Sequence, residues 1–177
     1  MQARSQVPRM SSAAPSSFSI SQRILHWAMA VLIATQFLTG QFFTGPHEPA
    51  TAGGPMAIDV PPLPILLHIG TGVSILALAI GRLSLRLLKG APESPAEEPR
   101  FFRFAAAGGH IALYAIMFLM PITGLTAMFG HVALAGRVHA GPLKLMLLAL
   151  IAVHVSAAFV HQYYWKTDVL RRMTRGT

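Results

Sequence analysis

The chain contains no cysteine and few charged residues. The lack of cysteine excludes disulfides, Cys-ligated zinc, iron–sulfur clusters and the C-x-x-C-H attachment of c-type haem. Only 11% of the 177 residues are charged, whereas an ordinary soluble domain has about 25%. The composition therefore argues against an ordinary soluble domain, and a haem in this chain would be held by coordination alone.

Charged residues are absent from four long stretches, which cover residues 24–47, 60–81, 104–136 and 145–165. Each stretch exceeds the ~20 residues that a membrane-spanning helix needs. We therefore predict an all-α fold, a transmembrane four-helix bundle with helices over about 20–43, 63–88, 101–128 and 139–165. These helices form one domain over 19–173. Residues 1–18 lack the apolar core of a cleavable signal peptide and are expected to form a flexible cytoplasmic tail.

Positive charge is distributed unevenly between the segments that join these helices. Of the 14 Lys and Arg residues, only Arg137 and Lys144 lie on the side opposite the N-terminus. The positive-inside rule then places both termini in the cytoplasm of a bacterium, with the chain in its inner membrane. The net charge of +8 thus reflects membrane topology. The expected partner is the lipid bilayer, and nucleic acid is not.

Four histidines fall at matching depths in the predicted helices. His26 and His154 lie toward the inner ends of helices one and four, and His68 and His139 lie toward the outer ends of helices two and four. An ionisable residue inside a membrane is a functional-site hypothesis, although a neutral histidine can also hydrogen-bond between helices. Two pairs at two depths meet the needs of two haems with two axial histidines each. We therefore expect these four residues to bind haem iron.

The spacing of His139 and His154 in the fourth helix predicts a local irregularity in that helix. His139 and His154 are fifteen residues apart, on the order of 22 Å along the axis. Fifteen residues rotate by about 1500°, which leaves the two imidazoles about 60° apart around the axis, and a local bulge would absorb that difference. Pro142 is expected in the first turn, where its missing N–H is not needed. His131 is the alternative outer ligand.

Other polar residues near the inner ends of the predicted helices could either contact a cofactor or lie at the membrane surface. His161 lies on the same face as His154, two turns closer to the cytoplasm. It could hydrogen-bond a quinone carbonyl or a haem propionate, or lie in the headgroup region. Arg82 and Arg86, four residues apart, could pair with the inner haem propionates or serve as membrane anchors. His110 is a further candidate propionate contact.

Several stretches together resemble the bacterial cytochrome b561 family. They are His26-Trp27, HIGTGVSILALAIGRLSLR in helix two, GHIALYAIMFLMPITGL in helix three and H…HVSAAFVHQYYWK in helix four. The resemblance covers about residues 19–173 and implies a four-helix, di-haem b membrane protein. It assigns His26 and His154 to the inner haem, and His68 and His139 to the outer haem. The family pattern has one residue fewer between the two helix-four ligands.

The resemblance also implies an activity. One branch of the family oxidises periplasmic superoxide to O₂ and passes the electrons through the haems to ubiquinone. We therefore expect a superoxide:ubiquinone oxidoreductase without a catalytic side chain, in which His161 and Trp165 lie at the quinone site. Arg137, Lys144 and His131 would attract the anion. The alternatives are a quinone-linked electron carrier or anchor subunit for another periplasmic redox protein. In another class, the alternative is a cofactor-free membrane protein such as a small transporter.

Overall fold

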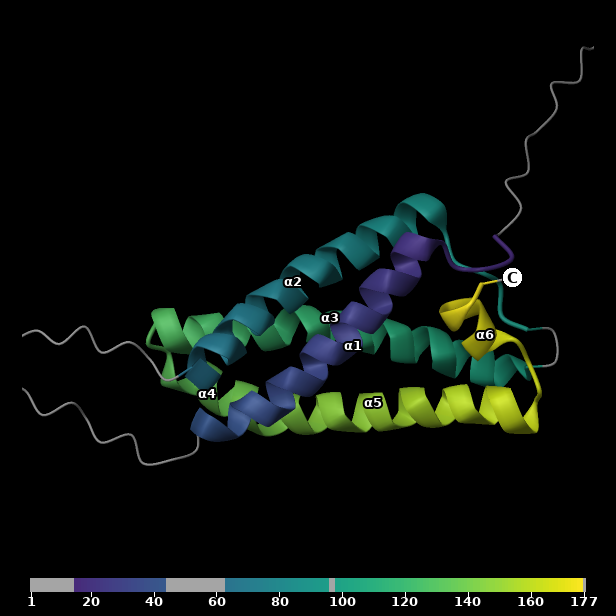
Figure 1. Ribbon diagram of the computed structural model, residues 1–177. Coiled ribbons are helices and arrows are strands. Elements are labelled where there is room, and N and C mark those ends of the chain that lie inside the picture. The colour runs from purple at the N-terminus through teal and green to yellow at the C-terminus, as the bar shows by residue number, and fades with distance from the viewer. Residues whose placement is uncertain (1–14, 44–62, 96–97, 177) are drawn as a thin grey trace, which may run out of the picture.

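The computed structural model describes residues 15–43, 63–95 and 98–176, and within these ranges the chain forms helices and no strand. Residues 1–14 of the predicted tail and the loop 44–62 lie outside the described part. The three long helices that come first are α1 (Ile20–Gly40), α2 (Leu63–Lys89) and α3 (Arg100–Phe129), and a short 3-10 turn (Gln41–Phe43) follows α1. Figure 1 shows them lying beside a fourth long helix.

The fourth long helix is a composite of four segments. They are α4 (Ala133–Val138), a π-helical segment (His139–Leu143), α5 (Lys144–Phe159) and a second π-helical segment (Val160–Tyr164). The helix begins at Ala133 rather than near residue 139, so Pro142 lies inside it and not in its first turn. The wider π turn accommodates a residue that has no amide N–H. The bulge expected from the histidine spacing is present, and it begins at His139.

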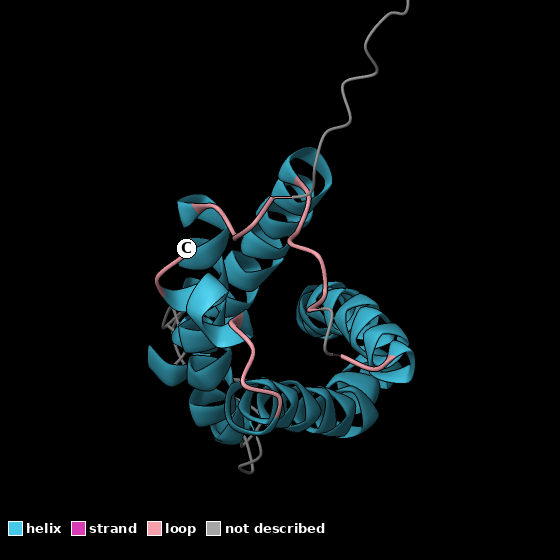
Figure 2. Cartoon of the chain, turned by 90° about the vertical axis from the view of Figure 1, so that its right-hand side faces the viewer, coloured by secondary structure: helices cyan, strands magenta, loops and turns pink. Residues whose placement is uncertain are grey.

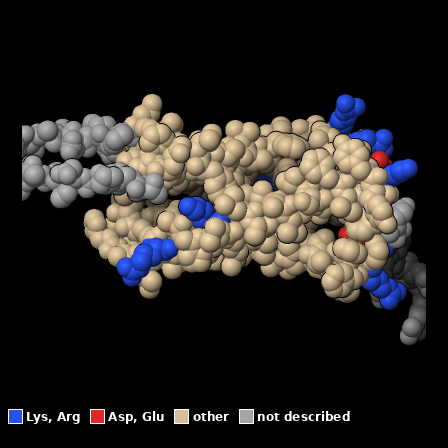
Figure 3. All heavy atoms as spheres, turned by 90° about the horizontal axis from the view of Figure 1, so that it is seen from below, with Lys and Arg blue, Asp and Glu red and all other residues tan. Residues whose placement is uncertain are grey.

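Three helices are long and apolar enough to cross a membrane: α2, α3 and the composite helix Ala133–Tyr164. α1 has 21 residues and is not among them, since it carries Gln22, Arg23 and Gln36. On the face seen in Figure 3, most Lys and Arg side chains lie toward the two ends of the molecule, and the middle is largely uncharged. The described part of the chain is therefore helical, with three helices suited to cross a membrane.

Backbone packing follows chain order, with α1 against α2, α2 against α3, and α3 against both α4 and α5. The last helix, α6 (Val169–Thr174), folds back beside the start of α1, as Figure 1 shows, and it leads to the end of the chain marked C in Figure 2. Arg23 Nη1 donates to the carbonyl of Thr174 at 3.0 Å, and Trp27 Nε1 donates to that of Met173 at 3.1 Å. We call this end of the molecule the α6 end and the opposite one the α4 end.

The buried apolar core lies between these two ends. Its members come from all four long helices: Met29, Ile75, Ala79, Ile116, Met117 and Leu147. Along α2 the core residues fall between His68 and Arg82, and along the composite helix Leu147 falls midway between His139 and His154. A dry apolar layer therefore separates the polar groups of the α4 end from those of the α6 end.

Candidate functional site

At the α4 end, His68 of α2 faces His139 of the first π-helical segment. Their ring centroids are 6.2 Å apart and the ring planes are inclined by 79°. Both side chains are half-buried, whereas His131 is exposed and has a φ of 55° just before α4. The structure therefore brings His139, and not His131, next to His68.

Hydrogen bonds fix the orientation of both rings in this pair. Nδ1–H of His139 donates to the carbonyl of Met120 at 2.8 Å. Nδ1–H of His68 donates to Oγ1 of Thr39 at 3.1 Å, because the Thr39 hydroxyl itself donates to the carbonyl of Thr35 at 2.7 Å. With Nδ1 protonated on both rings, each Nε2 keeps its lone pair. Metal-ligating histidines are held in this way by a partner on the other ring nitrogen.

Two glycines, Gly40 and Gly124, lie directly against the rings of His68 and His139. A Cβ at Gly40 would lie 3.2 Å from Cε1 of His68, and a Cβ at Gly124 would lie 3.0 Å from Cε1 of His139. Glycine thus lets α1 and α3 approach these imidazoles closely. The two imidazoles are therefore packed closely against α1 and α3.

At the α6 end, three imidazoles lie together. His154 of α5 is 6.1 Å from His26 of α1 and 5.7 Å from His110 of α3, measured between ring centroids. Trp27 contacts His26 edge-on, with centroids 5.4 Å apart. The structure therefore brings the predicted pair His26 and His154 together and adds His110, which the sequence indicated only as a propionate contact.

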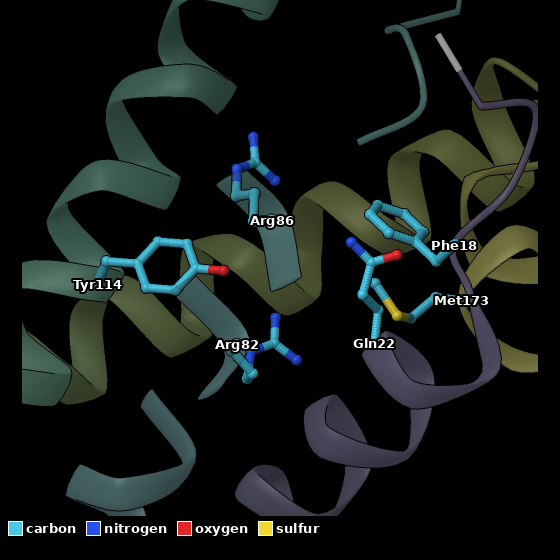
Figure 4. A pocket seen from close by; sticks show the side chains of 6 residues that line it. All are labelled: Phe18, Gln22, Arg82, Arg86, Tyr114 and Met173. Atoms are coloured by element: carbon cyan, nitrogen blue, oxygen red, sulfur yellow. The ribbon is translucent and has the colours of Figure 1, made fainter. Parts of the chain in front are cut away.

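A small pocket beside these imidazoles contains two arginines. Its lining residues are Phe18, Gln22, Arg82, Arg86, Tyr114 and Met173. Nη1 of Arg82 is buried without a hydrogen-bond partner, although the side chain is also bonded to Tyr114. Figure 4 shows Tyr114 and Gln22 pointing from opposite sides toward the space near the arginines. Because Arg82 is within electrostatic reach of His26 and His154, a carboxylate bound here would lie beside the imidazoles.

His161 is placed differently from the other histidines. It is 7% exposed and is enclosed by Trp165, whose ring contacts it edge-on at 4.8 Å. Its Nδ1 lies 2.9 Å from Oγ1 of Thr167, and its Nε2 lies 3.5 Å from Oε1 of Glu98. Both ring nitrogens thus face protein groups. Sequence reasoning missed Glu98, which precedes α3 in a short polar loop and carries no motif.

The two histidine pairs fit a haem better than a bare metal ion. Within the described ranges, no group of three or more His, Asp or Glu side chains could hold a metal ion. Haem iron takes its remaining ligands from two axial side chains. With metal–nitrogen bonds of about 2 Å and roughly 1 Å from each nitrogen to its ring centre, two imidazoles on one metal have centroids about 6 Å apart. The observed 6.1 and 6.2 Å agree with this spacing.

Apolar membrane helices with histidine pairs at both ends are typical of membrane cytochromes of the b type. Residues 17–176 match the family model for prokaryotic cytochrome b561. The chain is also 32% identical over 165 residues to cytochrome b562 of Cereibacter sphaeroides, an alignment that covers 87% of this chain and 92% of the relative. The chain therefore belongs to the prokaryotic cytochrome b561 family, as its motifs predicted.

Family membership sets the general function. The protein is a membrane cytochrome of haem b type that takes part in electron transfer. This sets aside the cofactor-free transporter considered from the sequence. The number of haems, the electron donor and the acceptor go beyond what membership implies.

Proposed function

We propose that the protein holds two haem b groups and carries electrons across the inner membrane, from periplasmic superoxide to ubiquinone. His26 and His154 would be the axial ligands of the inner haem, and His68 and His139 those of the outer haem. The observation that carries this proposal is that two histidine pairs lie on opposite sides of the apolar core. Within each pair the ring centroids are 6.1 or 6.2 Å apart. When bound, haem iron supplies the one-electron chemistry.

The proposed topology is a transmembrane four-helix bundle with both termini in the cytoplasm. α1 would be the fourth membrane-spanning helix, because its His26 would have to bind the same haem as His154 of α5. The α6 end carries Lys166, Arg171 and Arg172, whereas the segments at the α4 end carry only Arg137 and Lys144. By the positive-inside rule the α6 end faces the cytoplasm. The outer pair, His68 and His139, then lies near the periplasm.

Each group of residues has a defined task in this proposal. Two histidines would hold each iron without an open position for O₂, so the bound haem would supply electron transfer. Arg82, Arg86 and His110 are suited to hold the inner propionates, since the unpartnered Nη1 of Arg82 needs an acceptor. Exposed Arg137 and Lys144 give the periplasmic end a positive field that attracts the superoxide anion.

The proposed quinone site lies at the α6 end, around Trp165. Its ring contacts Phe102 of α3 edge-on with centroids 5.2 Å apart, and Phe102 is 47% exposed. A quinone ring entering from the bilayer can stack on such aromatic side chains. His161 lies directly behind Trp165. The site would thus have an aromatic surface toward the lipid and a polar group toward the protein interior.

Haem quantitation tests the cofactor assignment. We expect the detergent-purified protein to contain two b haems per chain by pyridine haemochrome, one after His139→Ala, and two after His131→Ala. One haem in the wild type, or no loss in His139→Ala, would overturn the ligand assignment.

Stopped-flow mixing with superoxide tests the activity. Rapid haem reduction, followed by reoxidation when a short-chain ubiquinone is added, is expected. Haems that respond to quinone and not to superoxide would identify a quinone-linked carrier for another periplasmic redox protein. Recovery of the chain from native membranes within a larger dehydrogenase would identify an anchor subunit.

A further inference from the structure

Glu98 places a carboxylate in an enclosed position at the α6 end. Its side chain is 3% exposed, and Oε1 lies 3.5 Å from Nε2 of His161, whose side chain is 9% exposed. The Glu98 backbone is held in place as well, because its N–H donates to the carbonyl of Pro95 at 3.2 Å and its carbonyl accepts from Nε of Arg103 at 2.9 Å. A buried carboxylate facing an imidazole is costly unless the two share a proton or a charge.

The contacts around His161 are best satisfied if a proton lies between Glu98 and His161. The Thr167 hydroxyl is 2.9 Å from Nδ1 of His161 and 3.2 Å from the carbonyl of the same residue. If the hydroxyl donates to the carbonyl, it accepts from Nδ1–H, and a second proton, on either Nε2 or Oε1, lies between His161 and Glu98. If the hydroxyl donates to Nδ1, the ring proton is on Nε2. In both cases a proton separates Nε2 from Oε1, since two buried lone pairs facing each other would repel.

We propose that Glu98 and His161 form the proton-donating pair of the inner quinone site. This inference rests on the proposed function. Reduction of a quinone to the quinol takes two electrons and two protons. In each one-electron step, one proton leaves the pair for a quinone oxygen as one electron arrives, and one proton from the cytoplasmic water restores the pair. Two superoxide anions, oxidised to two O₂, balance one quinone and two protons.

The surroundings of the pair suit this task. Trp165 contacts His161 and also Phe102, so the pair lies immediately behind the aromatic surface proposed for the quinone. The charged groups on the neighbouring elements are Glu93, Arg100, Arg103, Lys166, Asp168, Arg171 and Arg172. Asp168 is paired with Arg171 at 3.1 Å, and Arg172 donates to the carbonyl of Glu93 at 3.2 Å. This mostly cationic rim surrounds Glu98 and His161, which are the two buried titratable side chains among the described residues.

The test uses Glu98→Gln in the haem-loaded full chain, with Glu93→Gln as the matched control. Glu93 lies in the same loop and its side chain is exposed. We expect Glu98→Gln to keep its haem content and its rate of haem reduction by dithionite, and to reduce short-chain ubiquinone at least tenfold more slowly, with the deficit growing as pH rises. Glu98→Asp, which keeps an exchangeable carboxyl, should recover part of the rate. Glu93→Gln should match the wild type.

A second readout does not depend on quinone turnover. Infrared difference spectra recorded across a pH titration should contain a carboxyl band that Glu98→Gln removes and Glu93→Gln retains. Unchanged quinone kinetics and an unchanged infrared spectrum in Glu98→Gln would overturn the proton-donating role and leave a structural contact. A wild type that binds haem but never reduces ubiquinone would instead refute the proposed quinone function, while the infrared band would still report whether Glu98 exchanges a proton with His161.

Discussion

The carbonyl oxygen of Met120 accepts a hydrogen bond from Nδ1–H of His139 at 2.8 Å. This bond joins α3 to the first π-helical segment, and the residue after Met120 is Pro121, which is buried inside α3. The hydrogen bond fixes the ring of His139, whose centroid lies 6.2 Å from that of His68, so the outer ligand geometry depends on α3 although α3 supplies neither imidazole. Two of the predictions below, Gly124→Ala and Thr39→Val, test such supporting contacts.

Gly124→Ala should disturb the outer site. The new Cβ would lie 3.0 Å from Cε1 of His139, and the ring cannot retreat without breaking its bond to Met120. We expect loss of the outer haem, or a shifted Soret band, in the purified variant. Gly136→Ala is the control, because its Cβ would meet Ala127 at an ordinary 3.5 Å. Equal haem spectra for both variants would contradict the close approach.

Thr39→Val should weaken the outer site without removing a ligand. The substitution is nearly isosteric and deletes the acceptor of Nδ1–H of His68. Loss of such an orienting partner typically costs about 10–100-fold in affinity or activity, so haem should transfer to apomyoglobin faster from this variant. Thr126→Val removes a hydroxyl that bonds only to the carbonyl of Ile122 on the exposed face, and its haem transfer should remain at the wild-type rate.

The inner site presents a choice between two partners for His154. His26→Ala should remove the inner haem, whereas His110→Ala should retain it, because the 6.1 Å spacing of His26 and His154 matches that of the outer pair. Haem content per chain and the electron paramagnetic resonance spectrum distinguish the two variants. Retention of both haems in His26→Ala together with loss of one in His110→Ala would reassign the ligand to α3.

Arg82→Gln should lower the reduction potential of the inner haem. The guanidinium lies near His26 and His154, and a positive charge stabilises the electron-rich reduced site. At an effective dielectric constant near 20, loss of one nearby charge shifts the potential by on the order of 50 mV. Arg100→Gln, at the exposed start of α3, should leave the potential unchanged. Redox titration of both variants in the same detergent checks this difference.

The sequence predicted the long helices because membrane helices leave a strong local signal. A run without charge must be long enough to span a bilayer, and the runs around α2, α3 and the composite helix are of that length. The depths of His26, His68, His139 and His154 followed from the same reasoning, since each position along a helix corresponds to a fixed rise.

The parts that sequence reasoning missed depend on contacts between distant residues. Nothing local marks Thr39 as the partner of His68, because its hydroxyl also makes the ordinary bond to the carbonyl four residues before it. Glu98 reaches His161 from a loop sixty-three residues away in sequence. The start of the last helix at Ala133 was missed because Pro142 suggests a helix beginning nearby, and the π-helical turn that accommodates a proline leaves no composition signal.

The π-helical segment at His139 also gives the chain a local tolerance to changes in length. A π turn contains one residue more than an α-helical turn. The extra residue is therefore absorbed within one turn, and the side chains of α5 keep the direction they would have after a regular α-helix. Removing one residue from this segment, such as Ala140, should convert it to regular α-helix while His154 keeps its orientation. A length change of one residue within α5, which has no such turn, would rotate His154 away from His26.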